Sequence, residues 1–369
     1  MKQKNIFITI ILIFVLSLFS TTSYAETTTS ETITLTNNLD LASKAVILID
    51  SKTGTELYSK NANKKMYPAS TTKIMTAILA IENGNLDDIV TASKSAISSI
   101  PSGYSSAYLV QGEKISLKDL LIVLLVHSAN EAANVIAEHI SGSVDEFVVL
   151  MNEKAKELGC EDTNFVNTNG IHDSEHYTTA SDLAIIANYC MKNETFREIV
   201  SMPSCTISKT NKSGIRKYSN TNTMIIENTD YYRDDCIGIK TGHTSQAGYC
   251  LVSAIQKDDM ELISVVLGGA NEEDRFKDSD SLLTYGYDAY DAFIKIQKSR
   301  EEEERRIAEE QARALAEKKA QEEALARRKT ILKTTLTIIL ITLFCIIIIR
   351  IIYVAKKRRI KKNSQGKHR

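Results

Sequence analysis

The chain has 369 residues, of which 43% are hydrophobic and 25% are charged, so it can form one large domain or two ordinary ones. Its net charge is −1, but eight Lys/Arg follow Ala355 and two lysines precede Ile6, which leaves −11 on the remainder. Such an acidic body does not suit a nucleic-acid partner, and none is expected.

Residues 1–25 have the features of a secretory signal peptide. Two lysines form a charged start, residues 6–19 are almost entirely apolar, and Ala25 ends a small-residue cleavage motif. The apolar run is short for a membrane span, which favours cleavage after Ala25 over an uncleaved anchor. Residues 26–40 are rich in Thr, Ser, Asn and Glu, and we expect them to form a flexible leader.

The predicted folded body covers residues 41–297. Helical spacing predicts three helices, over residues 70–81, 117–127 and 131–140. Strand patterns occur at both ends of the body, over residues 45–50, 55–59, 238–242, 247–255 and 261–267. Because the helices lie between terminal strands, the strands can pair in one antiparallel sheet. The expected fold class is α/β (α+β), with a sheet flanked by helices and a helical subdomain.

Three further segments follow the body. Residues 298–329 are almost all Glu, Arg, Lys, Ala and Gln, with acids and bases at helical separations, which predicts a solvated helical stalk about 45 Å long. Residues 330–354 form an apolar helix long enough to cross a bilayer. The tail, residues 355–369, is more basic than the upstream flank, so the positive-inside rule places it in the cytoplasm. We therefore expect a single-pass cell-membrane protein whose body is extracytoplasmic.

The chain contains six cysteines, and Cys345 lies in the apolar span. The other five form an odd set without regular spacing, so they do not indicate a disulfide framework. Most are expected to be buried thiols that act as small apolar residues.

Three short patterns point to chemistry. They are Ser-x-x-Lys at Ser70/Lys73, Ser-x-Asn at Ser128/Asn130, and Lys-Thr-Gly at Lys240-Thr241-Gly242. Each pattern also occurs a second time, in the basic tail, at a strand end or in a hairpin turn, so none is specific by itself. In the first set, Ser70 instead opens an apolar helix, Ser128 joins two helices and Lys240 ends a short strand. Its order is that of Ser-x-x-Lys acyl-transfer enzymes.

The spacing of Ser70 and Lys73 has a chemical reason. Residues three apart share one helix face, so the amine can take the proton of the hydroxyl and make it a nucleophile. The amine can do so only when neutral, and its reference pKa of about 10.4 must fall roughly three units, about 4 kcal/mol. Burial and a second cation both lower a lysine pKa, and Lys240 could be that cation.

Three segments resemble the low-molecular-mass penicillin-binding proteins, which are serine D-alanyl-D-alanine carboxypeptidases. The similar residues are Tyr67–Ala77, Asn164–Asp182 and Gly238–Cys250, and the resemblance covers about residues 40–297. It implies a penicillin-binding/β-lactamase-like fold and removal of the terminal D-alanine from peptidoglycan stem peptides that end in D-Ala-D-Ala. It also implies β-lactams as inhibitors, and neither a cofactor nor a metal.

The resemblance also implies roles for the motif residues. Ser70 would form the acyl-enzyme and Lys73 would act as general base. Ser128 would relay a proton to the leaving D-alanine, and Asn130 would bind the substrate amide.

The remaining roles concern the substrate carboxylate and the oxyanion. Lys240 and Thr241 would hold the carboxylate, and Gly242 would let the strand approach the peptide closely. The backbone N–H groups of Ser70 and His243 would form the oxyanion hole. Arg275 is a further candidate ligand of the carboxylate, with a surface arginine as the alternative.

Other classes of protein remain as alternatives. The pattern from His172 to His176 matches a zinc motif, but it follows a loop signal, whereas the ligands would need a helix. A β-lactamase shares the three motifs but needs a group that activates water for deacylation. A non-enzymatic wall-binding protein would be expected to lose the nucleophile or the base. The chain also departs from the family that it resembles, because many members of that family carry a β-rich domain before an amphipathic anchor.

Overall fold

The computed structural model describes residues 39–365, so the predicted signal peptide, most of the leader and the last four residues lie outside the described part. The strands are β1 (Ala45–Asp50), β2 (Glu56–Lys60), β3 (Ile89–Thr91), β4 (Lys114–Ser116), β5 (Ser204–Ile207), β6 (Arg216–Ser219), β7 (Cys236–Thr244), β8 (Gly248–Lys257) and β9 (Met260–Gly269). The helices are α2 (Lys73–Asn83), α3 (Lys94–Ser98), α4 (Leu117–Val126), α5 (Asn130–Ser141), α6 (Val144–Glu157), α7 (Ala180–Met191), α8 (Glu194–Val200) and α9 (Glu272–Gln365), with short 3-10 turns η1 (Ala69–Thr72) and η2 (Thr223–Ile225).

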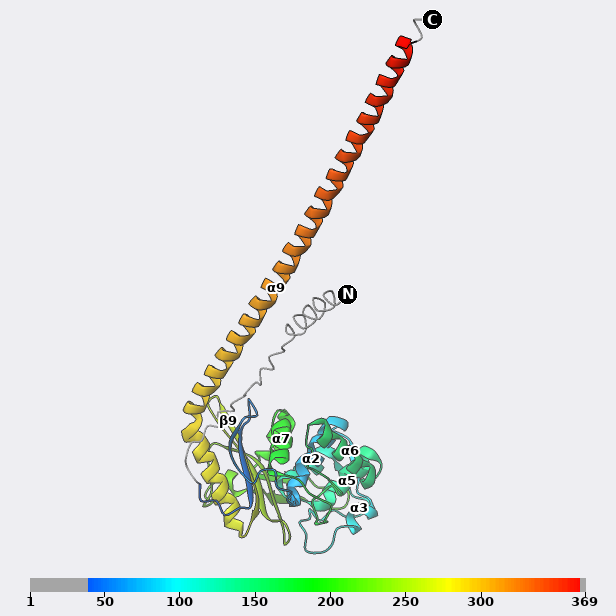
Figure 1. Ribbon diagram of the computed structural model, residues 1–369. Helices are drawn as coiled ribbons and strands as arrows, with labels where there is room; N and C mark the ends of the chain where they lie inside the picture. The colour runs from blue at the N-terminus through cyan, green and yellow to red at the C-terminus, as the bar shows by residue number, and fades with distance from the viewer. Residues whose placement is uncertain (1–38, 366–369) are drawn as a thin grey trace, which may run out of the picture. The chain divides into compact units, whose positions relative to one another are not determined.

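The central element is a five-stranded antiparallel sheet with the order β2-β1-β9-β8-β7 (Figure 1). Ile47 of β1 pairs with Val265 of β9, and Val265 also faces Val252 of β8. The N-terminal hairpin therefore joins the C-terminal strands in one sheet. This pairing confirms the antiparallel sheet predicted from the sequence.

Both faces of the inner strands β1, β8 and β9 are buried, which explains why these strands are hydrophobic along most of their length. On β1, Val46 and Leu48 point to the face covered by the first turns of α9, where they join Phe276 and Leu283. Ile47 and its neighbours on the same side point to the helical region on the opposite face. The body therefore has three layers, with the sheet in the middle (Figure 1).

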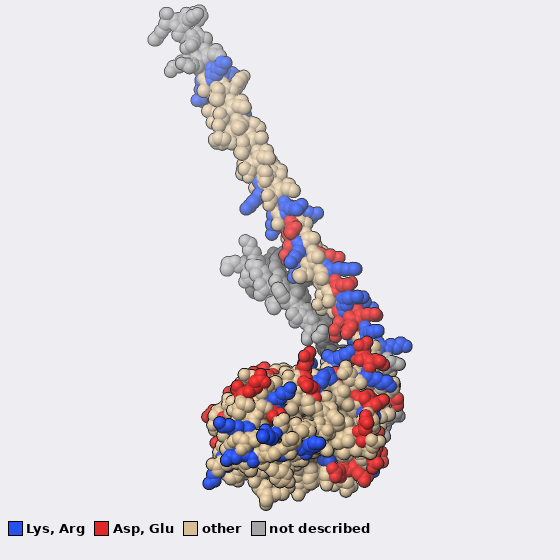
Figure 2. Space-filling view, turned by 180° about the vertical axis from the view of Figure 1, so that it is seen from behind, with Lys and Arg blue, Asp and Glu red and all other residues tan. Residues whose placement is uncertain are grey.

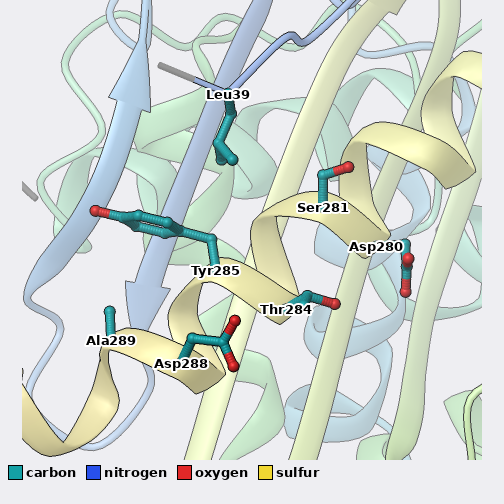
Figure 3. A pocket seen from close by; sticks show the side chains of 7 residues that line it. All are labelled: Leu39, Asp280, Ser281, Thr284, Tyr285, Asp288 and Ala289. Carbon is teal, nitrogen blue, oxygen red and sulfur yellow. The ribbon is translucent and has the colours of Figure 1, made fainter. Parts of the chain in front are cut away.

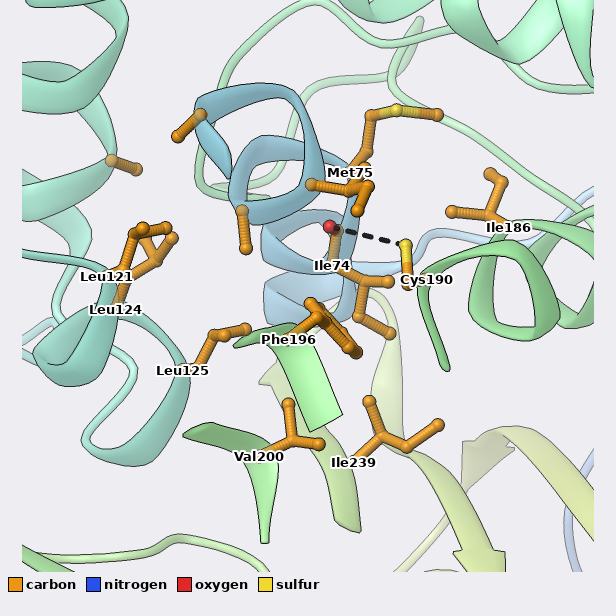
Figure 4. Close-up of a cluster of buried hydrophobic side chains, with 14 of the residues drawn as sticks. Ile74, Met75, Leu121, Leu124, Leu125, Ile186, Cys190, Phe196, Val200 and Ile239 are labelled. Atoms are coloured by element: carbon orange, nitrogen blue, oxygen red, sulfur yellow. Dashed lines mark hydrogen bonds between the residues drawn. The ribbon is translucent and has the colours of Figure 1, made fainter. Parts of the chain in front are cut away.

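The helical region is built around α2, which is buried on nearly all sides. Figure 4 shows side chains of α2 enclosed by α4, α7, α8 and strand β7. Ile74, Phe196 and Ile239 are each fully buried there. A fully buried aliphatic or aromatic side chain contributes roughly 1.5–3 kcal/mol, so this packing holds the start of α2 firmly in place.

The predicted helices are confirmed with small shifts of their ends, but several elements were not predicted. Helices α6, α7 and α8 and the two small sheets, β3-β4 and β5-β6, were absent from the prediction. Lys240 does not end a short strand, because β7 continues to Thr244. The C-terminal helix begins at Glu272 rather than at residue 298. Its first turns resemble an ordinary core helix, with Phe276 and Leu283 facing the sheet.

The described residues divide into two compact units between Tyr290 and Asp291. The second unit is the continuation of α9. Acidic and basic side chains alternate along it and then give way to a continuous apolar stretch (Figure 2). This stretch is long and apolar enough to cross a membrane, with a mean hydropathy of 2.9.

All six cysteines are free thiols. Cys160, Cys190 and Cys250 are buried in the first unit, and Cys345 lies in the apolar stretch. Burial raises the pKa of Cys160 to about 12 and that of Cys250 to about 11. The buried thiols therefore pack as small apolar groups.

Candidate active site

Ser70 and Lys73 lie where the turn η1 leads into α2. The two side chains meet there, with 2.8 Å between Lys73 Nζ and Ser70 Oγ. This distance is that of a hydrogen bond, so the proton of the hydroxyl can pass directly to the amine. The spacing of Ser-x-x-Lys therefore produces the contact that the sequence predicted.

The hydrogen-bond partners of Lys73 can all be satisfied by a neutral amine. Its Nζ also lies 2.9 Å from Asn130 Oδ1 and 2.7 Å from the carbonyl oxygen of Asn169. The amide nitrogen of Asn130 donates to the carbonyl of Ser105 at 2.9 Å, so it is the amide oxygen that faces Lys73. This oxygen and the carbonyl oxygen of Asn169 can only accept hydrogen bonds. A protonated amine would donate its three hydrogens to these two acceptors and to Ser70 Oγ. Once the amine loses a proton, two hydrogens serve the two acceptors and its lone pair is left for the hydroxyl of Ser70.

The electrostatic environment acts in the same direction. Lys73 is fully buried, and burial lowers its pKa well below the ordinary value of 10.5. The charge of Lys240 lowers this pKa further, whereas Glu131 raises it. Desolvation is the largest cause, as expected for a lysine that must lose its proton near neutral pH.

The second motif occupies the junction between α4 and α5. Ser128 has a left-handed backbone with φ of 64° and is buried. Asn130 begins α5, and both its backbone N–H and its side-chain amide donate to the carbonyl of Ser105. Asn130 therefore connects Lys73 to the loop before α4, a role that differs from binding the substrate amide alone.

The third motif lies within β7, at the edge of the sheet. Lys240 is fully buried, and its Nζ donates to the carbonyl of Thr241 at 3.1 Å. Burial, and then the charge of Arg275, lower the pKa of Lys240 to about 7. Thr241 donates to the hydroxyl of Thr221 at 2.6 Å. Thr221 was not predicted, because no motif marks it; it reaches the site from the segment between β6 and η2.

Gly242 brings β7 close to the turn that carries Ser70. A Cβ atom at position 242 would lie 3.0 Å from both Pro68 O and Ser70 N, and 3.1 Å from Ala69 Cβ. A side chain there would push the strand away from the nucleophile. Contact with the turn η1 therefore favours a glycine at the third position of Lys-Thr-Gly.

His243 and Arg275 complete the group of predicted residues. Arg275 is only 5% exposed, so it is not a surface arginine. Its guanidinium pairs with Glu272 at 2.5 Å and lies over the ring of Tyr249, which also stacks on His243. Burial, and after it the charge of Arg275, lowers the pKa of both Lys240 and His243, so this charge acts on the third motif.

The segment from Thr163 to Thr178 forms one wall beside the nucleophile. Asn169 contacts Lys73, and Gly170 lies against the carbonyl of Ala69. The histidines of the zinc-like pattern face the same turn: His172 packs edge-on against Tyr67, and His176 contacts Thr72. Among the described residues, no group of three His, Cys, Asp or Glu side chains converges as a metal site would require.

A separate pocket lies beside the first turns of α9 (Figure 3). It is lined by Leu39, Asp280, Ser281, Thr284, Tyr285, Asp288 and Ala289. None of the predicted site residues lines it, and Asp280 is already paired with Arg233 at 2.6 Å. The pocket therefore belongs to the layer of α9, away from the three motifs.

Together, the fold and the three motifs define a serine acyl-transfer enzyme of the Ser-x-x-Lys type. Residues 28–271 match the family model described as D-alanyl-D-alanine carboxypeptidase. The chain belongs to this family, which confirms the predicted resemblance and the class of serine peptidase. Neither a β-lactamase nor a non-enzymatic wall-binding protein is favoured by the comparisons.

Two curated relatives illustrate the similarity. The chain is 33% identical to D-alanyl-D-alanine carboxypeptidase DacF of Bacillus subtilis, over 72% of this chain and 70% of the relative. It is 34% identical to DacA of Haemophilus influenzae, over 72% of this chain and 67% of that protein.

Solved structures support the same assignment. The DD-transpeptidase of Streptomyces K15 aligns with a TM-score of 0.64 and 32% identity, over 68% of this chain and 99% of the other. The carboxypeptidase DacD of Francisella tularensis aligns with a TM-score of 0.62 and 30% identity, over 68% of this chain and 71% of the other. The similarity to the Streptomyces enzyme spans almost its whole length, which confirms the predicted fold class.

Proposed function

We propose that the chain removes the terminal D-alanine from peptidoglycan stem peptides through an acyl-enzyme on Ser70. The observation that carries this proposal is the set of three hydrogen-bond partners around Lys73. Two of them are obligate acceptors and the third is Ser70, so an amine that has lost one proton can direct its lone pair at the nucleophile. Family membership supplies the substrate class, and β-lactams enter as analogues that acylate the same serine.

The proposed reaction has two halves. Ser70 Oγ attacks the carbonyl carbon between the two D-alanines, and its proton moves to Lys73 Nζ. The oxyanion is stabilised by the backbone N–H groups of Ser70 and His243, a kind of donor worth roughly 10² to 10³ in rate. The C–N bond then breaks as Ser128 passes a proton to the leaving amine. Water hydrolyses the ester and restores Ser70.

Recognition of the substrate carboxylate is assigned to the buried cations beside the nucleophile. Lys240 and Arg275 are both buried. Burial lowers the pKa of each cation, and the charge of Arg275 lowers that of Lys240 further, so a protonated Lys240 would gain from a negative partner. A carboxylate would be such a partner, and the hydroxyl of Thr241 could donate to it. A terminal carboxylate, as in D-Ala-D-Ala, is therefore favoured over a continuing peptide chain.

We also propose the arrangement of the whole chain at the membrane. A signal peptide over residues 1–25 would be removed after Ala25, and the leader over residues 26–40 would precede the catalytic domain at residues 41–297. The charged stalk at residues 298–329 would connect this domain to a membrane helix at residues 330–354. The asymmetry of basic charge supports a cytoplasmic tail at residues 355–369 and an extracytoplasmic catalytic domain.

Labelling with a reporter penicillin tests the site. The purified full-length protein should be labelled on the peptide that contains Ser70, and Ser70→Ala should abolish the label. Ser59→Ala, at an exposed serine on β2 outside the site, should label as the wild type does. Mass spectrometry of a D-Ala-D-Ala pentapeptide incubated with the protein should show loss of one D-alanine. Undiminished labelling of Ser70→Ala would contradict the assignment.

A further inference from the structure

The wall formed by residues 163–178 contacts the nucleophile segment at several successive positions. Met66 and Thr178 exchange two backbone hydrogen bonds, of 2.7 and 2.9 Å. Farther along, the hydroxyl of Thr76 donates to the carbonyl of Thr168 at 2.6 Å. Between these two points lies Thr72, which contacts His176. The wall is therefore bonded on both sides of the turn that carries Ser70, and His176 contacts this turn through its side chain.

The contacts of His176 fix the position of every hydrogen involved. The backbone N–H of Val166 donates to His176 Nδ1 at 3.0 Å, so Nδ1 carries no hydrogen. The proton of the neutral ring is then on Nε2, which lies 2.8 Å from Thr72 Oγ1. The hydroxyl of Thr72 in turn donates to the carbonyl of Ala69 at 2.8 Å. Because a backbone N–H can only donate and a carbonyl can only accept, this chain of bonds has a single direction.

The last acceptor in this series of hydrogen bonds, Ala69, is a strained residue. Ala69 has φ of 48°, a left-handed conformation that costs an alanine roughly 1–2 kcal/mol. Such a residue keeps this conformation only when its surroundings impose it. Ala69 immediately precedes Ser70, so its backbone sets the direction of both the N–H and the side chain of the nucleophile.

We propose that His176 is a positioning residue, which orients Ser70 through Thr72 and the carbonyl of Ala69. The inference rests on the proposed function, because it assigns to His176 a part in the acylation of Ser70. It also gives a role to the histidine of the zinc-like pattern that the catalytic motifs leave unexplained. The ring acts in its neutral form, and it touches neither substrate nor the hydroxyl of Ser70.

The surroundings keep the ring neutral. His176 is 2% exposed, and burial is the main reason that its pKa falls to about 4. Asp173 raises this pKa, whereas His172 and Lys73 lower it. A protonated ring would place an N–H on Nδ1 against the N–H of Val166, two donors facing each other. At neutral pH the chain of hydrogen bonds is therefore intact.

Two substitutions separate the two ends of the imidazole. The amide nitrogen of His176→Gln reaches the place of Nε2 and can donate to Thr72. The shorter amide of His176→Asn reaches only the place of Nδ1 and can accept from Val166. We expect the acylation rate constant of a reporter β-lactam to fall roughly tenfold to a hundredfold in His176→Asn. His176→Gln should recover at least about a third of the wild-type rate, with the initial binding constant little changed in both.

A double-mutant cycle distinguishes positioning from general support of the fold. Thr72→Val removes the hydroxyl, and His176→Asn combined with it should be no slower than the slower single variant. Multiplied losses in the double variant, or equal rates for His176→Asn and His176→Gln, would overturn the proposal. His139→Asn is the matched control. His139 lies on α5 and pairs with Asp88 at 3.1 Å, so this variant should be acylated at the wild-type rate. Circular dichroism confirms that each variant is folded.

A spectroscopic measurement of the His176 tautomer tests the proposal independently of activity. Nitrogen-15 NMR of the full-length protein in detergent, labelled at its six histidines, should show for His176 a neutral ring with the hydrogen on Nε2. Thr72→Val should shift the Nε2 signal. A ring protonated on Nδ1 would overturn the proposal. A wild-type protein that forms no acyl-enzyme would instead contradict the proposed function, while the tautomer would still decide on His176.

Discussion

Gly170 lies against the carbonyl group of Ala69 so closely that a Cβ atom at position 170 would come within 1.8 Å of the carbonyl oxygen. The same atom would lie 2.9 Å from Thr72 Oγ1. Gly170 also has φ of 85°, which glycine adopts without strain. The wall beside the nucleophile can therefore approach the turn only because residue 170 has no side chain.

Replacing Gly170 by alanine should both destabilise the protein and slow acylation. The left-handed backbone costs about 1–2 kcal/mol, and the overlap with Ala69 must be relieved by moving backbone, so we expect at least about 3 kcal/mol in total. Gly142→Ala is the control, because Gly142 has φ of 80° but open space around it. Urea unfolding of both variants measures the difference. Equal losses of stability would show that the contact with Ala69 is unimportant.

Lys73 and Lys240 should respond differently to arginine. Arginine is too basic to accept a proton from Ser70, so Lys73→Arg should abolish acylation although the charge remains. Lys240→Arg keeps a cation for the carboxylate and should retain measurable activity. We expect the loss at Lys73 to be larger by at least tenfold, about 1.4 kcal/mol. Stopped-flow acylation of the two folded variants provides the comparison, and equal rates would exclude Lys73 as the general base.

The pKa of Lys240, about 7, predicts a decline of activity in alkaline solution. Binding of the carboxylate requires protonated Lys240, so kcat/KM should fall about tenfold for each pH unit above this value. Neutral Lys73 is required at the same time, so its protonation should set the acidic side of the profile. In Lys240→Arg the cation persists at higher pH, and the alkaline decline should move upward. If the decline of kcat/KM occurs at the same alkaline pH in this variant as in the wild type, the decline is caused by another group.

The arrangement at the membrane can be tested with protease. If the catalytic domain is extracytoplasmic, protease added to intact spheroplasts should release a soluble fragment that still binds penicillin. The cut is expected in or near the charged segment at residues 298–329, where all described side chains are exposed. An antibody against the basic tail should detect its epitope only after lysis. A catalytic domain protected until lysis would reverse the proposed topology.

The strands and helices with strong periodic patterns could be predicted from the sequence. The pattern of β1 is a short apolar run, and α4 and α5 follow helical spacing between recognisable ends. Helix α7 was missed although its N-cap, Thr179, accepts a hydrogen bond from Asp182. Its apolar residues occur nearly all round the helix because it packs between other elements, so no amphipathic stripe marked it.

The candidate catalytic residues could be proposed from the sequence because their motifs are local, whereas the partners that contact them are distant in sequence. Ser70 and Lys73 are three residues apart, but Asn169 reaches Lys73 across 96 positions, and His176 reaches Thr72 across 104. Asn169 contacts Lys73 through its backbone carbonyl, which every residue type has, so the identity of residue 169 gave no signal. For Arg275, the sequence could not distinguish a buried from a surface side chain. Its burial depends on packing against Tyr249 and Glu272, which only the structure shows.

The free thiols of the first unit bear on how the protein matures. None of its five cysteines is bonded to another in the described structure, and burial raises the pKa of each thiol, so little reactive thiolate is present at neutral pH. Stability comes from the packed core around α2 and the sheet instead of from covalent cross-links. Folding of this unit would then need neither an oxidant nor a disulfide isomerase.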